Sequence, residues 1–181
     1  MPLKNHTSYI VRSTRLLLVP CLLSFIALFI SSCGIYKFKD INFDPTLKTV
    51  KVNFIVNNAR YVNPQLSPKL TDKLRQKIVS QTRLTQTNSD NADWEISGEI
   101  KEYSVTTSGI SQQQVSINRL NVTVQITVLD HRTNEQQEPI LITKNFDFSA
   151  NLTLQAAEAQ LTDEIIRNLT DEIFNRIFSN W

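Results

Sequence analysis

Two pairs of carboxylates and one histidine are the side chains of this sequence that could support acid–base chemistry. Asp93 lies two residues before Glu95, and Glu99 lies three before Glu102. Such pairs can act as general acid and base where their environments separate their pKa values. His131 lies in the polar stretch LDHRTNEQQEP, which predicts a solvated turn. Because no nucleophile accompanies a base, the sequence predicts that the protein is not an enzyme, and a carboxylate-based hydrolase stays open as an alternative.

Cysteine, histidine and glycine usage gives no pattern for a metal centre or a phosphate-binding loop. The cysteines are Cys21 and Cys33, and the histidines are His6 and His131. A zinc site needs several such ligands close together. The three glycines are too dispersed to cradle a phosphate. We therefore expect no metal and no cofactor other than a lipid attached to the chain.

The N-terminal residues have the layout of a secretion signal. Lys4, Arg12 and Arg15 precede an apolar run over 16–30, which is shorter than the roughly 20 residues that span a bilayer as a helix. The order Ile, Ser, Ser, Cys over 30–33 then resembles a bacterial lipobox, in which the cysteine becomes the lipid-modified first residue. The sequence predicts a lipoprotein signal peptide over 1–32 and a diacylglyceryl and N-acyl (palmitate-type) lipid on Cys33.

Removal of this leader changes the charge of the chain. Three of the 19 basic residues and none of the 17 acidic residues lie in the leader, so the remainder has a formal charge of −1. No basic excess remains that would favour nucleic acid as a partner. The remaining 149 residues are enough for one domain with one core. We expect a lipidated tether over 33–48 and a single domain over 49–181.

Hydrophobic periodicity predicts the elements at both ends of this domain. Apolar residues alternate with polar ones over 50–56, which is typical of a half-buried strand. Ser67 followed by Pro68 indicates a helix start with a hydroxyl cap, and an apolar residue then recurs every fourth position through about Gln81. A second amphipathic helix is predicted over 161–177.

The middle of the chain is rich in strands. The pattern predicts strands over 94–105, 120–128 and 140–148, and the change of parity near Lys101 and Glu102 indicates a bulge. Short connections make these strands antiparallel. The fold class is therefore α+β, in the order β-α-β-β-β-α, with a four-stranded mixed or antiparallel sheet and two helices packed on one face. The other face carries threonine, asparagine and glutamine and is open to a partner.

Five short stretches then point to a family. They are CGIYKF from Cys33, NNARYVNPQLS over 57–67, SQTRL over 80–84, SGEIKEY over 97–103 and NRLNVTV over 118–124. In this order, behind a lipobox, they resemble the LptE family of lipopolysaccharide-assembly lipoproteins in the form found in Bacteroidetes. The helix over 161–177 resembles the family only in its pattern.

The resemblance implies a binding and assembly role. Such proteins sit at the inner leaflet of the outer membrane, face the periplasm, occupy the lumen of the β-barrel LptD, and help it deliver lipopolysaccharide to the outer leaflet. Gly34 after the lipidated cysteine also favours the outer membrane. Relatives from other phyla bind lipopolysaccharide through basic side chains, for which the candidates here are Arg119, Lys69, Lys73 and Lys77.

Purely structural roles for the same residues, and a more general function for the protein, stay open as alternatives. Arg119 could be a strand residue paired with a nearby acid, and the three lysines could be a solvated flank of the first helix. The protein could also be a general lipid-tethered periplasmic adaptor, or an auxiliary subunit of a lipid transporter.

Overall fold

The computed structural model describes residues 46–111 and 114–178, without the side chains of 110–116. The signal peptide over 1–32, the lipidation site at Cys33 and the tether as far as residue 45 lie outside the described residues, so these expectations stay predictions. The described strands are β1 (Thr49–Val52), β2 (Val56–Asn57), β3 (Thr85–Gln86), β4 (Trp94–Ser111), β5 (Gln114–Asp130), β6 (Glu135–Gln136) and β7 (Ile140–Ser149). The described helices are α2 (Leu66–Gln81) and α3 (Leu154–Phe178).

The strands form one mixed sheet in the order β3-β1-β4-β5-β6, in which β2 also pairs with β4 and β7 also pairs with β5. β1 and β2 run parallel to β4, because a helix-containing crossover connects them, whereas β4, β5 and β7 are antiparallel. The predicted α+β class and the antiparallel middle strands are confirmed.

Within the described residues the sheet has seven strands and not the predicted four. The first predicted strand is interrupted between β1 and β2, and both parts flank β4 in succession. In the same way β6 and β7 both flank β5, and the two-residue β3 adds to the edge of β1. The prediction failed because strands of two residues, such as β2, β3 and β6, are too short to show alternating hydrophobicity in the sequence.

The predicted bulge is confirmed. The register shifts between the pairs Ile100 with Val124 and Glu102 with Thr123, so Lys101 has no partner of its own in this ladder. The extra residue allows Ile100 and Tyr103 to be buried together although three positions separate them.

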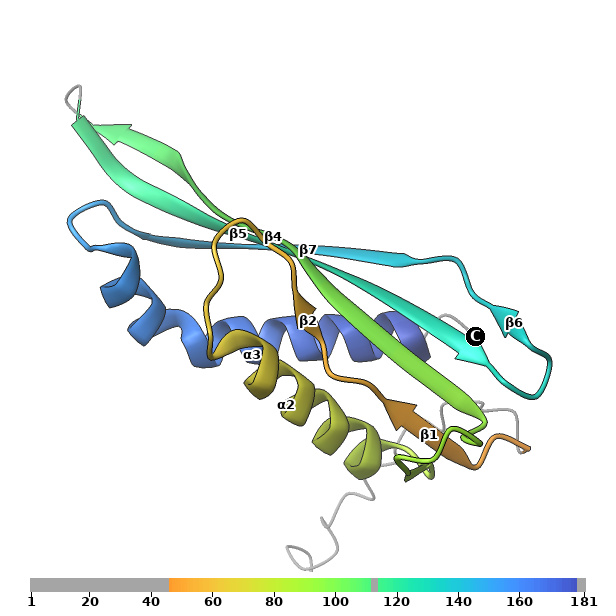
Figure 1. Cartoon of the computed structure of the whole chain (residues 1–181). Helices are drawn as coiled ribbons and strands as arrows, with labels where there is room; N and C mark the ends of the chain where they lie inside the picture. The colour runs from red at the N-terminus through yellow and green to blue at the C-terminus, as the bar shows by residue number, and fades with distance from the viewer. Residues whose placement is uncertain (1–45, 112–113, 179–181) are drawn as a thin grey trace, which may run out of the picture. The chain divides into compact units, whose positions relative to one another are not determined.

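Both helices lie on the same side of the sheet, as Figure 1 shows. Leu70, Leu74 and Ile78 of α2 are fully buried in the same core as the alternate residues of β5 from Leu120 to Val128. α3 has 25 residues and extends along the sheet for about 37 Å at 1.5 Å per residue. Within the described part of the chain, neither helix combines the length and the apolar character needed to cross a membrane.

The predicted hydroxyl cap of the first helix is wrong. α2 begins at Leu66, and the hydroxyl of Ser67 is buried within its first turn without a hydrogen-bond partner. Gln65 is the N-cap residue and makes no side-chain capping bond, and just before it the side-chain oxygen of Asn63 accepts a hydrogen bond from the Gln65 N–H at 2.9 Å. Asparagine readily forms such a turn because its side chain bonds the backbone two residues on.

Gly98 marks the closest approach between β4 and the core. A Cβ atom at this position would lie 2.9 Å from Ile126 Cδ1 and 2.9 Å from Ile55 Cγ1. We expect Gly98→Val to lower the free energy of unfolding by about 1–3 kcal/mol through overpacking. Thr107→Val introduces the same side chain at an exposed position of β4 and should change stability by less than about 0.5 kcal/mol. Urea unfolding of both variants is the measurement, and equal stabilities would contradict the predicted clash.

Candidate functional site

The candidate site is the outer face of the sheet, which points away from α2 and α3. Residues alternate along a strand, so the neighbours of the buried positions of β4, β5 and β7 all lie on this face. Among the described elements, no helix or strand packs over it (Figure 1). Its central positions are Ser97, Glu99, Glu102 and Ser104 on β4, Asn121, Thr123, Gln125 and Thr127 on β5, and Thr143, Asn145 and Asp147 on β7.

Side chains on this outer face bond to one another across the strands. Thr123 lies at the centre, where its Oγ1 is 3.0 Å from Thr143 Oγ1 and 3.3 Å from Glu102 Oε2. Near one end, Asn121 Nδ2 donates to Thr106 Oγ1 at 3.1 Å. These lateral bonds hold the polar groups in a fixed pattern while leaving donors and acceptors for water or a partner.

Arg119 and Asp147 form a bidentate ion pair on the outer face. Nε and Nη2 of the arginine donate to the two carboxylate oxygens at 2.6 and 2.8 Å. This geometry follows from the register, since the two residues are direct partners on β5 and β7. The hydrogen bonds lower the pKa of Asp147 and raise the pKa of Arg119. The expectation that Arg119 could pair with a nearby acid therefore describes its position in this structure.

At the other end of the face, Glu95 is held by two neighbours. Asn53 Nδ2 donates to Glu95 Oε1 at 2.6 Å, and His131 Nε2 lies 2.9 Å from Glu95 Oε2. His131 belongs to the turn between β5 and β6 and is exposed, as the sequence predicted. The hydrogen bond from Asn53 is the largest cause of the lowered pKa of Glu95, and the hydrogen bond from His131 is the second.

The carboxylates that the sequence singled out serve as hydrogen-bond acceptors. The pKa of Glu95 is lowered, and that of Glu99 is lowered first by the bond from Asn58. Burial raises the pKa of Asp93, but hydrogen bonds from the start of β1 outweigh it. A general acid needs a raised pKa. Among the described residues, each carboxylate with a resolved shift is moved downward, and no cluster of three metal-ligating side chains occurs.

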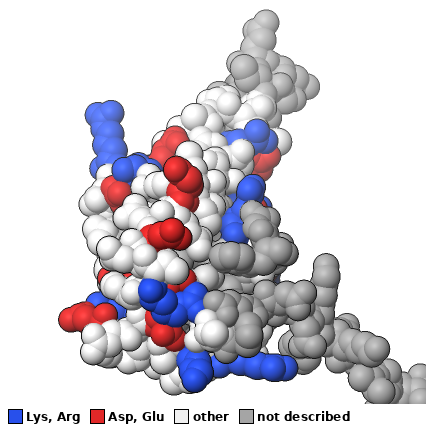
Figure 2. Space-filling view, turned by 90° about the vertical axis from the view of Figure 1, so that its right-hand side faces the viewer, with Lys and Arg blue, Asp and Glu red and all other residues white. Residues whose placement is uncertain are grey.

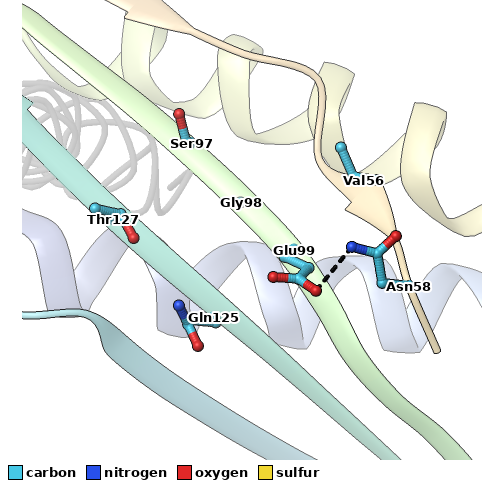
Figure 3. Close-up of a pocket in the computed structure, with 7 residues that line it drawn as sticks. All are labelled: Val56, Asn58, Ser97, Gly98, Glu99, Gln125 and Thr127. Atoms are coloured by element: carbon cyan, nitrogen blue, oxygen red, sulfur yellow. Dashed lines mark hydrogen bonds between the residues drawn. The ribbon is translucent and has the colours of Figure 1, made fainter.

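A shallow hollow of about 260 Å³ lies in the outer face beside the β2 edge. Figure 3 shows the carboxylate of Glu99 turned toward Asn58, whose amide donates to it at 2.8 Å. The lining consists of Val56, Asn58, Ser97, Gly98, Glu99, Gln125 and Thr127. Most of the lining side chains are polar, so the hollow suits a small hydrogen-bonding group of a partner surface.

The basic residues proposed from the sequence do not converge. Arg119 is on the outer face of β5, because its neighbour Leu120 is buried in the core. Lys69, Lys73 and Lys77 follow α2, which packs against the opposite face of the sheet. These residues therefore cannot form one basic patch.

Lys77 differs from the other two lysines of α2. Its Nζ lies 2.8 Å from Asp171 of α3 and 5.1 Å from the centre of the Phe174 ring, so it joins the two helices. Lys69 and Lys73 are exposed and make no ion pair with another described residue. Sequence reasoning missed the Lys77 contact, because the spacing within α2 carries no information about the position of α3.

Charge on the surface is mixed. Figure 2 shows lysine, arginine and acidic side chains scattered among uncharged ones on one side of the molecule. On this side of the molecule (Figure 2) the two signs of charge lie close together, so they partly cancel at a distance.

Comparisons with known proteins agree with this architecture. A family model described as LptE, lipopolysaccharide-assembly, matches residues 47–177. Among curated proteins no match is found. The chain is similar to a minor lipoprotein from Acinetobacter baumannii at 18% identity and a TM-score of 0.51, over 74% of this chain and 94% of that one.

Two further solved structures are similar. A protein from Xanthomonas campestris matches at 10% identity and a TM-score of 0.53, over 73% of this chain and 83% of that one. Lipoprotein B from Nitrosomonas europaea matches at 17% identity and a TM-score of 0.49, over 74% and 83% of the two chains. At these identities, the two matches with TM-scores above 0.5 show a shared fold alone.

Glu95 should make stability depend on pH. Its pKa is lower in the folded state than the usual value near 4.3, so the ionised carboxylate stabilises the fold above that pH, and the contribution is lost as the pH falls through the folded pKa. We expect Glu95→Gln to be less stable than the wild type at pH 7 and to lose less stability between about pH 4.3 and pH 3. Urea unfolding at steps of pH tests this, and parallel curves for the two proteins would refute it.

Proposed function

This chain belongs to the LptE lipopolysaccharide-assembly family, and we propose that it is an outer-membrane lipoprotein that plugs an LptD-type β-barrel translocon and helps it assemble. Members of the family are generally non-enzymatic lipoproteins. In the proposed role the protein sits at the inner leaflet, faces the periplasm and the barrel lumen, and assists delivery of lipopolysaccharide to the outer leaflet. It performs no catalysis and needs no cofactor apart from its own lipid.

The polar outer face of the sheet carries this proposal. The interior of a large transmembrane barrel is polar and wet. A plug must therefore present polar, hydrogen-bonding surface to the barrel wall while keeping its own core closed. This domain has that division, since its buried apolar side chains pack under two helices and its outer face carries mainly threonine, asparagine, glutamine and paired charges, with Leu141 and Ile117 as exposed apolar exceptions.

The proposed lipid on Cys33 provides the attachment to the membrane. Thr46, the first described residue, lies thirteen positions after Cys33. At about 3.3–3.6 Å per residue the extended tether would reach at most about 45 Å. Such a length lets the domain enter a barrel from the periplasmic side while its lipid stays in the inner leaflet.

We further propose that lipopolysaccharide contacts this subunit through basic side chains, with Lys69 and Lys73 as the main candidates. Both are exposed on α2, so their ammonium groups are available to phosphate. Lys77 and Arg119 stay candidates, although a phosphate would have to compete with Asp171 for the lysine and with Asp147 for the arginine.

The partner is tested by recovering the tagged full-length protein from its own outer membrane in mild detergent. We expect one large β-barrel related to LptD to accompany it in a one-to-one ratio, as identified by mass spectrometry. Cys33→Ser should leave the protein out of the membrane fraction. Recovery with an inner-membrane transporter, or without any partner, would replace the proposal with a general periplasmic adaptor.

The lysine contact is tested with purified lipopolysaccharide. We expect the double variant Lys69→Gln, Lys73→Gln to bind it more weakly, by about tenfold at low salt, because two charge-assisted hydrogen bonds are lost. Arg167→Gln removes an exposed cation of α3 and serves as the matched control, which should bind like the wild type. Arg119→Gln should have a smaller effect than the double variant. Unchanged binding of the double variant would remove these lysines as contacts.

A further inference from the structure

The outer edge of β7 is a long strand edge without a partner among the described strands. β7 runs for ten residues, from Ile140 to Ser149, and pairs only with β5. Figure 1 shows β7 above α3 at one side of the sheet. An edge of this length presents a row of unpaired N–H and C=O groups to its surroundings.

The register identifies which residues present these groups. The His131 N–H donates to the Asp93 carbonyl at 2.9 Å, so odd-numbered residues of β5 bond to β4 and even-numbered ones face β7. In the β5–β7 ladder Val122 pairs with Lys144, so even-numbered residues of β7 bond to β5. The odd-numbered residues Leu141, Thr143, Asn145 and Asp147 therefore direct their backbone groups outward.

The opposite edge of the sheet consists of short strands and is partly capped by α2. β3 pairs with the first part of β1. Beyond it, Arg75 of α2 donates to the Val52 carbonyl at 2.7 Å, and the Ile55 N–H donates to Thr71 Oγ1 at 3.0 Å. Two side chains one helical turn apart thus satisfy the backbone groups where β1 ends. Within the described part of the chain, no hydrogen bond does the same for the outward side of β7.

Features that usually protect a strand edge are weak along β7. Proline is absent from Ile140 to Ser149. Lys144, on the helix side of β7, forms an ion pair with Glu172 at 2.8 Å. Asp147, on the outer face of β7, forms an ion pair with Arg119. Leu141 lies on the outer face of β7 and is 61% exposed, which is the largest exposed fraction among the large apolar residues of the described chain. The edge is therefore competent to pair.

We propose that the β7 edge binds an extended segment of the β-barrel partner by strand addition. A ladder of alternating donors and acceptors at strand spacing is matched only by another extended polypeptide, which excludes a lipid as the occupant. The segment would place an apolar side chain beside Leu141, and its outward side chains would continue the polar outer face. This inference rests on the proposed function, because it takes the barrel as the source of the segment.

Asn145→Pro tests the edge directly. It removes an outward N–H without removing a bond to β5, and proline is tolerated on edge strands. Asn145→Thr keeps the N–H and is the matched control. We expect the barrel recovered with the full-length proline variant to fall about tenfold, while the control behaves like the wild type. Thermal unfolding of both variants checks the fold, and Leu141→Lys, which adds a charge to the edge, should weaken recovery in the same way.

Hydrogen exchange on the wild-type protein gives a second measurement that needs no variant. In the complex the amides of Leu141, Thr143, Asn145 and Asp147 should exchange at least about tenfold more slowly than in the free protein, because they become hydrogen-bonded. The even-numbered amides of β7 should change little.

Each other outcome overturns the inference in a recognisable way. If the barrel is recovered but the odd-numbered amides exchange as in the free protein, the edge is not the binding site, and the proposed function stands. If no barrel is recovered with the wild type, the proposed function and this inference both fail. If the amides are protected in the isolated protein as its concentration rises, a second copy occupies the edge and the barrel segment does not.

Discussion

The two-residue period of β5 is the constraint on which the rest of the structure depends. Its even-numbered residues from Leu120 to Val128 are fully buried, so its odd-numbered residues must form the polar outer face. The same alternation means that the odd-numbered residues of β5 bond to β4 and its even-numbered residues bond to β7. It therefore also determines which backbone groups of β7 face away from the sheet. A slip of one residue would exchange core and polar face together, which is why the register is strongly specified.

Much of this arrangement could be predicted from the sequence, because it depends on local periodicity. The alternation over 120–128 and 140–148, the two amphipathic helices and their order gave the α+β class. The bulge at Lys101 was predictable for the same reason, since Ile100 and Tyr103 fall on opposite parities and yet are both apolar. The polar outer face, which forms the candidate site, followed from the residues that alternate with the core.

The features that could not be predicted depend on contacts between distant segments. The pairing of Arg119 with Asp147 requires the register of β5 against β7, which the intervening turn and β6 set. The capping of Val52 by Arg75 requires the position of α2 over the sheet edge. The start of α2 could not be predicted either, because Ser67 lies inside the first turn of the helix and Asn63 forms a turn just before it.

The distribution of paired charges suggests that the two sides of the domain recognise partners by different physics. On the outer face Arg119 and Asp147 satisfy each other, and exposed pairs of this kind contribute little net energy and are screened by salt. Association through this face would therefore depend on hydrogen bonds and shape and respond weakly to ionic strength. On the helix side, Lys69 and Lys73 lack such partners among the described residues, so an anionic ligand there would be strongly salt-dependent. The proposed barrel contact and the proposed lipid contact would then lie on opposite sides of the domain and would not compete.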